Sequence, residues 1–420
     1  MNQTIELREH QVDNAKSYEL PNEDGSNEKI NLSKAQFIII MIGLFFTISV
    51  AALDTTIITT SVGVIASDLN GFQDIAWVAT AYFLTSNAFE LLYGKFSDIF
   101  GRKPTILFAL SIFLIGSILC GVAQNIEMLI IARAIAGIGG GGLMTLCTII
   151  ISDLVPLKKR GYYMGLTTGI FTVSSTLGSI LGGIFVLKLS WRWCFYINIP
   201  ICVIAMIIII VFFRFPSDSN NFKEKLNRVD YFGCITLLIF TILLTLALNW
   251  GGQTYSWSSA AVLVPLVLSI MFMFAFIYLQ LKVSKEPIIP SNILVRNVNA
   301  CGLITFCNGT IFFSIIIYIP LYNQIAYQES SLQSTIGILP VICGMIVCSI
   351  FSGSIISRTG KYRFFSIIGT LLGFVGSILL TQFVSVDVSR TLIYIFTAVV
   401  GAGIGLCMQA TTIASQAAVG

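Results

Sequence analysis

Long apolar runs alternate with short polar connections along this chain of 420 residues. After a polar stretch that ends near residue 34, each run is long enough for a helix that crosses a bilayer, which takes about 18 to 20 mostly apolar residues. The pattern therefore predicts an all-α membrane protein. We expect twelve spans, at about 36–62, 75–93, 104–123, 127–150, 163–187, 195–213, 230–249, 259–281, 298–325, 332–355, 364–383 and 391–417.

Composition excludes the soluble alternatives. Hydrophobic residues make up 56% of the chain and charged residues 10%, whereas ordinary globular chains have about 45–50% and about 25%. A cytosolic enzyme, a nucleic-acid-binding protein, a secreted disulfide scaffold and a disordered chain are all excluded. The ten cysteines lie in or beside apolar runs without a CxxC pair, so we interpret them as small hydrophobic residues.

The basic residues indicate an orientation. Twenty of the 24 lysines and arginines fall in the polar tail or in alternate connections, three lie in the opposite connections (Lys188, Arg192 and Arg390), and Arg133 lies within a span. Because cytosolic loops of membrane proteins are enriched in lysine and arginine, this division predicts a cytosolic N-terminus.

An internal repeat predicts the domain organisation. Two glycines seven residues apart follow span two (Gly94 and Gly101), and two more follow span ten (Gly353 and Gly360). Related loops after related helices indicate a duplicated bundle with an inserted two-helix hairpin. The second half should also have six helices, but only four are present. We therefore expect two C-terminal helices to be missing. Either the chain is a fragment or it is an unusual product. The predicted parts are a disordered cytosolic tail (1–34), an N-terminal six-helix bundle (35–213), a cytosolic linker (214–229), the inserted hairpin (230–282) and the C-terminal bundle (283–420).

The loop after span two is the most specific motif, and we interpret it as a cytosolic gate. Glycine lets two helices and a tight turn approach closely, and Asp98 can pair with arginine or lysine and hold neighbouring helices together. An ordinary basic inner loop would explain Arg102 and Lys103, but not the acid and the two glycines. The gate motif comprises Gly94, Asp98, Gly101, Arg102 and Lys103.

This loop resembles the signature of the major facilitator superfamily. The surrounding sequence is similar to the fourteen-span drug:proton antiporter family of fungi and bacteria, including its vacuolar basic amino acid transporter branch. The segments that carry the resemblance are 53–57 (LDTTI), 77–82 (WVATAY), 133–140 (RAIAGIGG) and 191–200 (WRWCFYINIP). The resemblance implies two pseudo-symmetric helix bundles, proton-driven export, and a proton-linked role for the arginine in span four, Arg133.

The antiporter motif of that family departs from its usual form here. Where the family has Gly-Pro-x-x-Gly-Gly in span five, this chain has Gly178-Ser179 and Gly182-Gly183. Without the proline a kink is weaker, while the glycines keep close helix packing. Two further departures are Gly63 in place of a proline and Glu90-Leu91 in place of Gln-Pro.

Three ionisable residues lie inside apolar runs: Asp54, Glu90 and Arg133. Such residues cost at least about 2.5–3.5 kcal/mol on insertion scales and mark functional sites by default. Burial and a nearby arginine act in opposite directions on the proton affinity of a carboxylate, which suits a group that loads and releases protons. Structural pairing between helices is the alternative for Asp54, and pairing with a loop lysine is the alternative for Glu90. The one histidine, His10, lies in the tail, so coupling falls to carboxylates.

Other sequence features point away from cofactors. Gly137, Gly139 and Gly142 fit GxGxxG, but a membrane helix rather than a strand precedes them, so they favour close helix packing over dinucleotide binding. The chain contains no GxxxxGK[ST] motif, and we expect no cofactor and no metal. Polar and aromatic residues that could line a substrate cavity, or equally bond one helix to another, are Tyr82, Asn87, Asn308, Tyr318, Tyr322, Gln324 and Gln409.

Together these features predict a proton-coupled antiporter rather than an enzyme. It would move organic solutes, drugs or basic amino acids out of the cytosol by alternating access, in the plasma membrane or the vacuolar membrane. Its partners would be a small substrate, protons and the bilayer, with no nucleic acid, and the protein would act as a monomer. Two membrane carboxylates suit a cationic substrate. The alternative is a non-transporting truncated or receptor-like protein of the same fold; a channel is less favoured because no charged ring or filter-like loop is evident.

Overall fold

The computed structural model describes residues 15–21, 27–213, 222–252, 254–284, 286–289, 295–328, 337–383 and 390–419. Within them, eleven helices are long and apolar enough to cross a membrane. The predicted second span is also a helix, but polar residues such as Asn87 and Glu90 dilute its apolar character. The long helices are α2 (Lys34–Ile57), α4 (Ile75–Phe100), α5 (Arg102–Gly121), α6 (Ile126–Leu154), α7 (Leu157–Lys188), α9 (Asn198–Phe212), α11 (Tyr231–Trp250), α12 (Ala260–Lys282), α13 (Arg296–Tyr327), α15 (Leu339–Thr359), α16 (Tyr362–Phe383) and α17 (Arg390–Val419).

Short elements connect or precede these helices. They are α3 (Val62–Asp68), α8 (Trp193–Tyr196), α10 (Phe222–Asn227), and the strands β1 (Ala15–Pro21) and β2 (Asn27–Ser33). The strands pair antiparallel from Ala15–Ser33 to Pro21–Asn27, where the sequence predicts a disordered tail. Their ladder pairs backbone groups, which every residue carries whatever its side chain, so the polar composition gave no signal for it.

The first predicted span is too long. Helix α2 stops at Ile57 and α3 begins at Val62, so the predicted segment 36–62 is one span followed by a turn. Hydroxyls around this turn bond back to nearby carbonyls, as Thr59 Oγ1 does to Thr56 O at 2.6 Å. Such local bonds offer the backbone an alternative to continued helix.

The chain divides into two compact units. Unit 1 contains residues 1–154 and 173–291, and unit 2 contains residues 155–172 and 292–420. The hairpin therefore belongs with the first bundle, whereas the beginning of α7, which the sequence places in the N-terminal bundle, belongs with unit 2. Glycines explain the second assignment, because a Cβ added at Gly161 would lie 3.0 Å from Gly353 Cα on α15.

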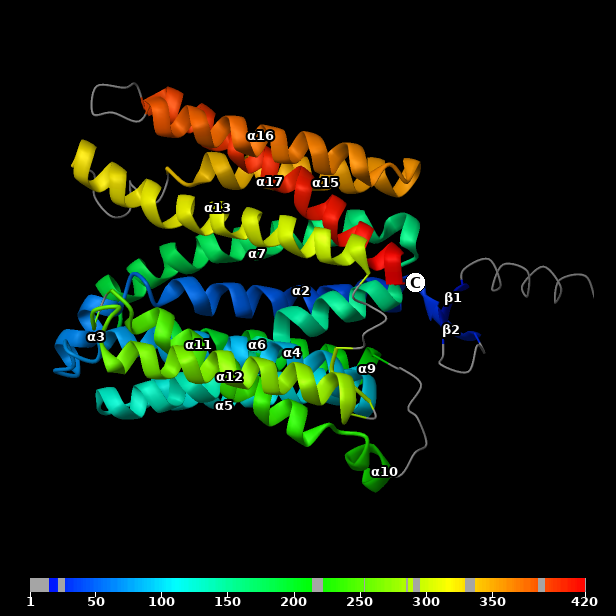
Figure 1. The fold of residues 1–420 in the computed structure, drawn as a ribbon, viewed down its shortest axis with the longest axis horizontal. Helices are drawn as coiled ribbons and strands as arrows, with labels where there is room; N and C mark the ends of the chain where they lie inside the picture. The colour runs from blue at the N-terminus through cyan, green and yellow to red at the C-terminus, as the bar shows by residue number, and fades with distance from the viewer. Residues whose placement is uncertain are drawn as a thin grey trace, which may run out of the picture. The chain divides into compact units, whose positions relative to one another are not determined.

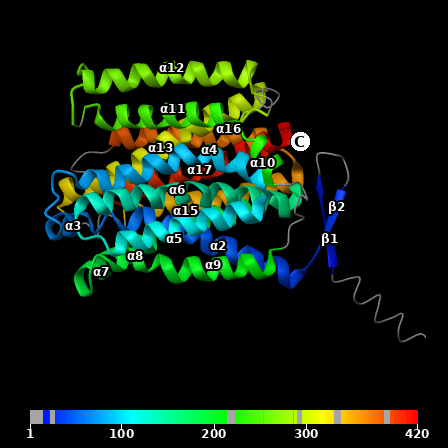
Figure 2. The same ribbon diagram turned by 90° about the horizontal axis from the view of Figure 1, so that it is seen from below.

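In unit 1, α6 packs against both α4 and α5; Figure 1 labels the three helices, and Figure 2 shows α6 between the other two. A Cβ at Gly137 would lie 3.0 Å from Tyr82 Cα on α4, and one at Gly139 would lie 2.5 Å from Ala109 O on α5. The glycine-rich segment thus brings the helix backbones together, as small residues do in membrane bundles. This confirms the packing interpretation of the GxGxxG pattern.

The inserted hairpin of α11 and α12 packs on α4 (Figure 2). Leu92 of α4 joins Leu237 of α11 and Phe276 of α12 in one apolar cluster. At one end Trp77 meets Trp250 edge to face, with ring centroids 6.0 Å apart. The ion pair between Lys95 and Glu286 at the other end, with an N–O distance of 3.6 Å, lies beside the gate motif.

Unit 2 is a smaller bundle of α13, α15, α16, α17 and the beginning of α7. Its core lies where α17 packs against α15, α16 and α13, around residues such as Val341, Val400 and Ile404.

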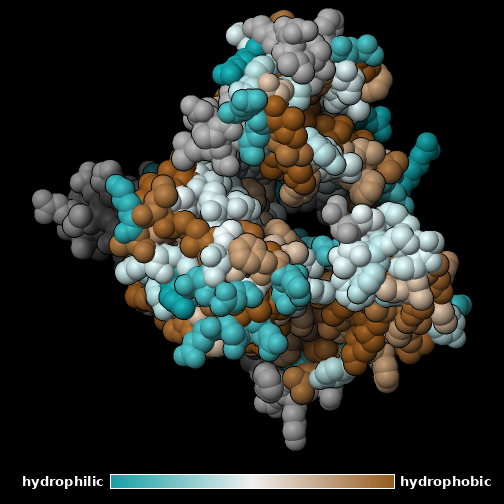
Figure 3. All heavy atoms as spheres, turned by 90° about the vertical axis from the view of Figure 1, so that its left-hand side faces the viewer, coloured by the Kyte–Doolittle hydropathy of each residue, from teal (hydrophilic) through white to brown (hydrophobic). Residues whose placement is uncertain are grey.

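Large apolar side chains are exposed on both units, including Leu187 at 85% and Phe306 at 73%. Figure 3 shows hydrophobic side chains at the surface of the molecule. Exposed apolar surface of this extent is expected of helices that face lipid.

Candidate functional site

A buried ion pair between α2 and α6 forms the centre of the candidate site. Arg133 Nη1 donates to Asp54 Oδ2 at 2.7 Å, across 79 residues of sequence. The side chains of Asp54 and Arg133 are 0% and 2% exposed. Two of the three ionisable residues singled out in the sequence therefore meet, and their charges neutralise each other inside unit 1.

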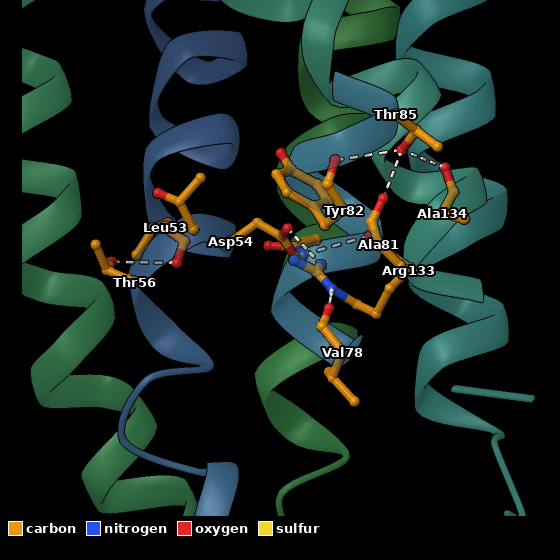
Figure 4. A network of polar contacts seen from close by, with 12 residues as sticks. Leu53, Asp54, Thr56, Val78, Ala81, Tyr82, Thr85, Arg133 and Ala134 are labelled. Carbon is orange, nitrogen blue, oxygen red and sulfur yellow. Dashed lines mark hydrogen bonds and ion pairs between the residues drawn. The ribbon is translucent and has the colours of Figure 1, made fainter. Parts of the chain in front are cut away.

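Helix α4 holds the arginine from two directions (Figure 4). Arg133 Nε donates to the carbonyl oxygen of Val78 at 3.2 Å, and the guanidinium carbon lies 4.1 Å from the centroid of the Tyr82 ring. A cation over an aromatic face is stabilised by the ring quadrupole. Tyr82, which the sequence gives as a residue that could line a cavity or bond one helix to another, is buried against Arg133.

The second oxygen of the carboxylate has a partner that the sequence analysis did not single out. Asn198 Nδ2, at the beginning of α9, donates to Asp54 Oδ1 at 3.0 Å and to Ser117 Oγ of α5 at 3.4 Å. Asn198 and Ser117 are fully buried. A signal was present, because Asn198 is a polar residue within the segment 191–200 that carried the family resemblance. The site thus joins five helices: α2, α4, α5, α6 and α9.

The antiporter-motif glycines lie beside this site, on the part of α7 that belongs to unit 1. A Cβ at Gly178 would lie 2.9 Å from Leu53 O, and one at Gly182 would lie 2.5 Å from Ile57 O. Both glycines let α7 pack directly on α2, next to Asp54. Gly183 differs, because a Cβ there would meet nothing within 4 Å, so its predicted packing role is wrong.

The gate motif forms a second polar cluster, where α4 turns into α5. Arg102 pairs with Asp98 one helical turn away, and its Nε lies 2.9 Å from Asp153 Oδ2 on α6. Asp98 on α4 thus pairs with an arginine of the neighbouring helix α5, as the sequence predicts, and Arg102 extends the contact to α6. Asp153 is the functional candidate that sequence reasoning missed, because it is 51 residues away along the chain.

The remaining gate residues have different environments. Gly101 has φ +98° and ψ 153°, a backbone conformation open essentially to glycine alone. Gly94 does not bring helices together, since a Cβ there would reach only Ile149 Cδ1, at 4.0 Å. Lys103 Nζ donates to Ile210 O on α9 at 2.8 Å.

Glu90 lies apart from the buried pair. It is exposed on α4, and it accepts a hydrogen bond from Thr145 Oγ1 of α6 at 3.2 Å. Within the described part of the chain it shares no hydrogen bond or ion pair with Asp54 or Arg133.

Of the other predicted cavity residues, Asn87 belongs to unit 1 and the rest belong to unit 2. Asn87 is exposed on α4, Tyr318 is exposed on α13, and Gln324 is half-buried. Asn308 donates to its own helix at Ile304 O, and Gln409 Nε2 donates to Ser349 Oγ at 2.9 Å. Tyr322 meets Tyr327 edge to face. For Asn308 and Gln409 these contacts favour the alternative of bonds within and between helices.

Among the described residues, no group of three or more histidine, cysteine or acidic residues could hold a metal ion.

Long apolar helices around a buried ion pair, with a charged helix turn beside the bundle, define a polytopic membrane protein. The sequence matches the Major Facilitator Superfamily over residues 44–420, and the chain belongs to this family. This confirms the resemblance recognised in the sequence.

Related sequences and structures agree with this assignment. The chain is 36% identical to the thioclapurine efflux transporter tcpA of Claviceps purpurea over 339 residues, which are 80% of this chain and 62% of that protein. It is also 36% identical to the efflux pump dotC of Dothistroma septosporum, over 80% of this chain and 59% of that protein. The chain thus spans about three fifths of the length of these relatives, which are transporters and not enzymes.

Solved structures share the fold. The xylose symporter XylE bound to a bromodeoxyglucose gives a TM-score of 0.57 at 13% identity, covering 92% of this chain and 87% of that one. The human organic anion transporter MFSD10 gives 0.56 at 17% identity, covering 91% and 92%. These similarities confirm the predicted fold class, a helical membrane protein with the major facilitator fold.

Proposed function

We propose that the protein is a proton-coupled exporter that moves organic solutes, drugs or basic amino acids out of the cytosol. The observation that carries this proposal is the fully buried pair of Asp54 and Arg133, placed within helices long enough to cross a membrane. The names of the relatives, an efflux transporter and an efflux pump, support the direction of transport.

The geometry supplies a mechanism for coupling. While Asp54 is ionised, its charge cancels that of Arg133. Protonation of Asp54 would leave the Arg133 cation buried beside a neutral acid, which is costly in a medium of low dielectric constant. The protonated site is therefore driven towards a conformation in which the cation gains water or another anion, and this change of exposure is what alternating access requires.

The other polar features take roles around this centre. Glu90 is the second acid of the proposal, exposed on the helix that also holds Arg133 through Tyr82 and Val78. The contacts of Arg102 with Asp98 and Asp153 close the cytosolic side, where the basic connections and the N-terminus also lie. An organic cation suits two carboxylates, and either the plasma membrane or the vacuolar membrane provides the proton gradient.

Transport in proteoliposomes tests the proposal. A proton gradient should drive accumulation of cationic dyes such as ethidium and rhodamine, and Asp54→Asn should abolish the driven component because the site can no longer exchange a proton. Asp68→Asn is the matched control, since the one hydrogen bond that Asp68 accepts from a described side chain comes from the Trp191 indole N–H, at 2.8 Å, and asparagine can still accept it. Undiminished gradient-driven transport by Asp54→Asn would contradict the coupling role.

A further inference from the structure

Asn198 combines three properties that the proposed mechanism does not use. It is fully buried, its amide nitrogen donates to the carboxylate oxygen of Asp54 that Arg133 leaves free, and its own carbonyl oxygen is buried with no hydrogen-bond partner among the described residues. A buried, unpaired amide oxygen is costly. A purely structural tie between α9 and α2 does not account for it.

The chemistry of the carboxylate fixes how this amide is oriented. An ionised carboxylate only accepts hydrogen bonds, so the amide must present its NH₂ group to Asp54. Because Arg133 occupies Oδ2, an arriving proton binds at Oδ1, the oxygen that faces Asn198. The same atom then becomes an O–H donor, and the NH₂ group is the wrong partner for it.

We propose that Asn198 is a positioning residue for the proton-carrying carboxylate, donating to Asp54 when the acid is ionised and, after a half-turn of its amide, accepting from Asp54 when it is protonated. This inference rests on the proposed function. The last torsion of an asparagine side chain has two broad, roughly equivalent orientations. The neighbouring Ser117 hydroxyl can follow the turn, because it accepts from the amide now and can donate to it afterwards.

The unpaired atom makes the two states comparable. With Asp54 ionised the amide oxygen has no partner within the described part of the chain, and with Asp54 protonated the amide nitrogen takes that position. Each state leaves one amide atom unpaired, so Asn198 orders both forms of the acid without favouring one strongly. Besides Asp54 on α2, the titratable groups around the site are Arg133 on α6, Tyr82 on α4, Cys120 on α5, Cys194 on α8 and Cys202 on α9.

Infrared difference spectroscopy of the full chain in lipid nanodiscs, titrated with acid, tests the proposal. The carbonyl band of protonated Asp54 is identified by its loss in Asp54→Asn, and the Asn198 amide band by its loss in Asn198→Leu in protein with isotope-labelled asparagine. We expect the amide band to shift with the same midpoint as the Asp54 band, and this shift to disappear in Asp54→Asn. Asn323→Leu is the matched control, since Asn323 is a buried asparagine of unit 2 whose amide nitrogen has no hydrogen-bond partner among the residues that the structure describes. Both bands should be unchanged in that variant.

The outcomes separate this inference from the function on which it rests. If the Asp54 band titrates while the amide band stays constant, Asn198 is only a structural tie and the inference is overturned, although proton coupling stands. If the Asp54 band does not titrate, the coupling role of Asp54 and this inference both fail. If Asn198→Leu does not fold, comparing the labelled protein with Asp54→Asn still decides the question.

Discussion

At the residue scale, the Asp54–Arg133 pair shows how a membrane bundle holds two charges. Both side chains are buried, and their neighbours include the Asn198 amide, the Val78 carbonyl and the Tyr82 ring. Removing one partner from a buried pair is worse than removing both, because the remaining charge has no neutralising partner. The pair is therefore stable in the bundle only while both side chains are charged.

This argument predicts a pattern in stability. Arg133→Met should lower the free energy of unfolding by about 3–5 kcal/mol, the usual loss when one member of a buried pair is removed. The double variant Asp54→Leu/Arg133→Met should recover most of that loss, because no charge remains buried. Thermal unfolding of the two single variants and of the double variant measures these losses of stability and completes a double-mutant cycle. If the loss in the double variant equals the sum of the losses in Asp54→Leu and Arg133→Met, the pair contributes no coupling energy.

At the element scale, α4 is the helix on which the candidate functions converge. It carries Tyr82 and Val78 against Arg133, presents Glu90 on its exposed face, and ends in the gate motif. These polar residues lower the hydrophobicity of α4. Contacts with α6 and with the inserted hairpin compensate for this loss of apolar character by burying the flanks of the helix. The turn from α4 into α5 depends on Gly101, as the corresponding turn from α15 into α16 depends on Gly360, whose φ is +68°.

The two glycines of the gate motif should therefore respond differently to the same substitution. Gly101→Ala should destabilise the protein by about 1–3 kcal/mol, since its backbone conformation is strained for any residue with a Cβ. Gly94→Ala should be neutral or stabilising by up to about 1 kcal/mol, because Gly94 is helical and a Cβ there would make only an ordinary van der Waals contact, with Ile149 Cδ1 at 4.0 Å. Denaturation midpoints of the two variants in detergent provide the measurement. A loss of stability on Gly94→Ala as large as that on Gly101→Ala would contradict the assignment of strain to Gly101.

At the scale of the whole molecule, two compact units and a surface rich in exposed apolar side chains describe a protein built for the bilayer. The units do not follow the sequence boundaries, because the inserted hairpin belongs with unit 1 and the beginning of α7 belongs with unit 2. The orientation of the protein in the membrane depends on the basic connections rather than on either core, since lysine and arginine are retained on the cytosolic side.

Protease protection in sealed vesicles tests this orientation. An epitope at the N-terminus should be protected in right-side-out vesicles and digested in inside-out vesicles. An epitope inserted in the connection between α11 and α12, on the predicted outer side, should show the reverse. Digestion of the N-terminal epitope from outside intact right-side-out vesicles would contradict the cytosolic assignment.

The sequence by itself determined the helices, the family and the residues worth examining. Apolar length is a local property, so the positions of the spans, and the isolated charges Asp54, Glu90 and Arg133 within them, could be read without coordinates. The glycine spacing of the gate motif likewise predicted a tight turn, because positive φ at Gly101 is a local requirement.

Only the tertiary structure decided which residues meet. Asn198 lies 144 residues from Asp54, and Asp153 lies 51 residues from Arg102; these pairings depend on how α2, α6 and α9 pack and on which faces they turn to one another. Packing also separated Gly178 and Gly182, which contact α2, from Gly183, which does not, and it kept Glu90 apart from the buried pair. The physical reason is that a helix presents several faces of similar polarity, and its neighbours select the one that becomes a site.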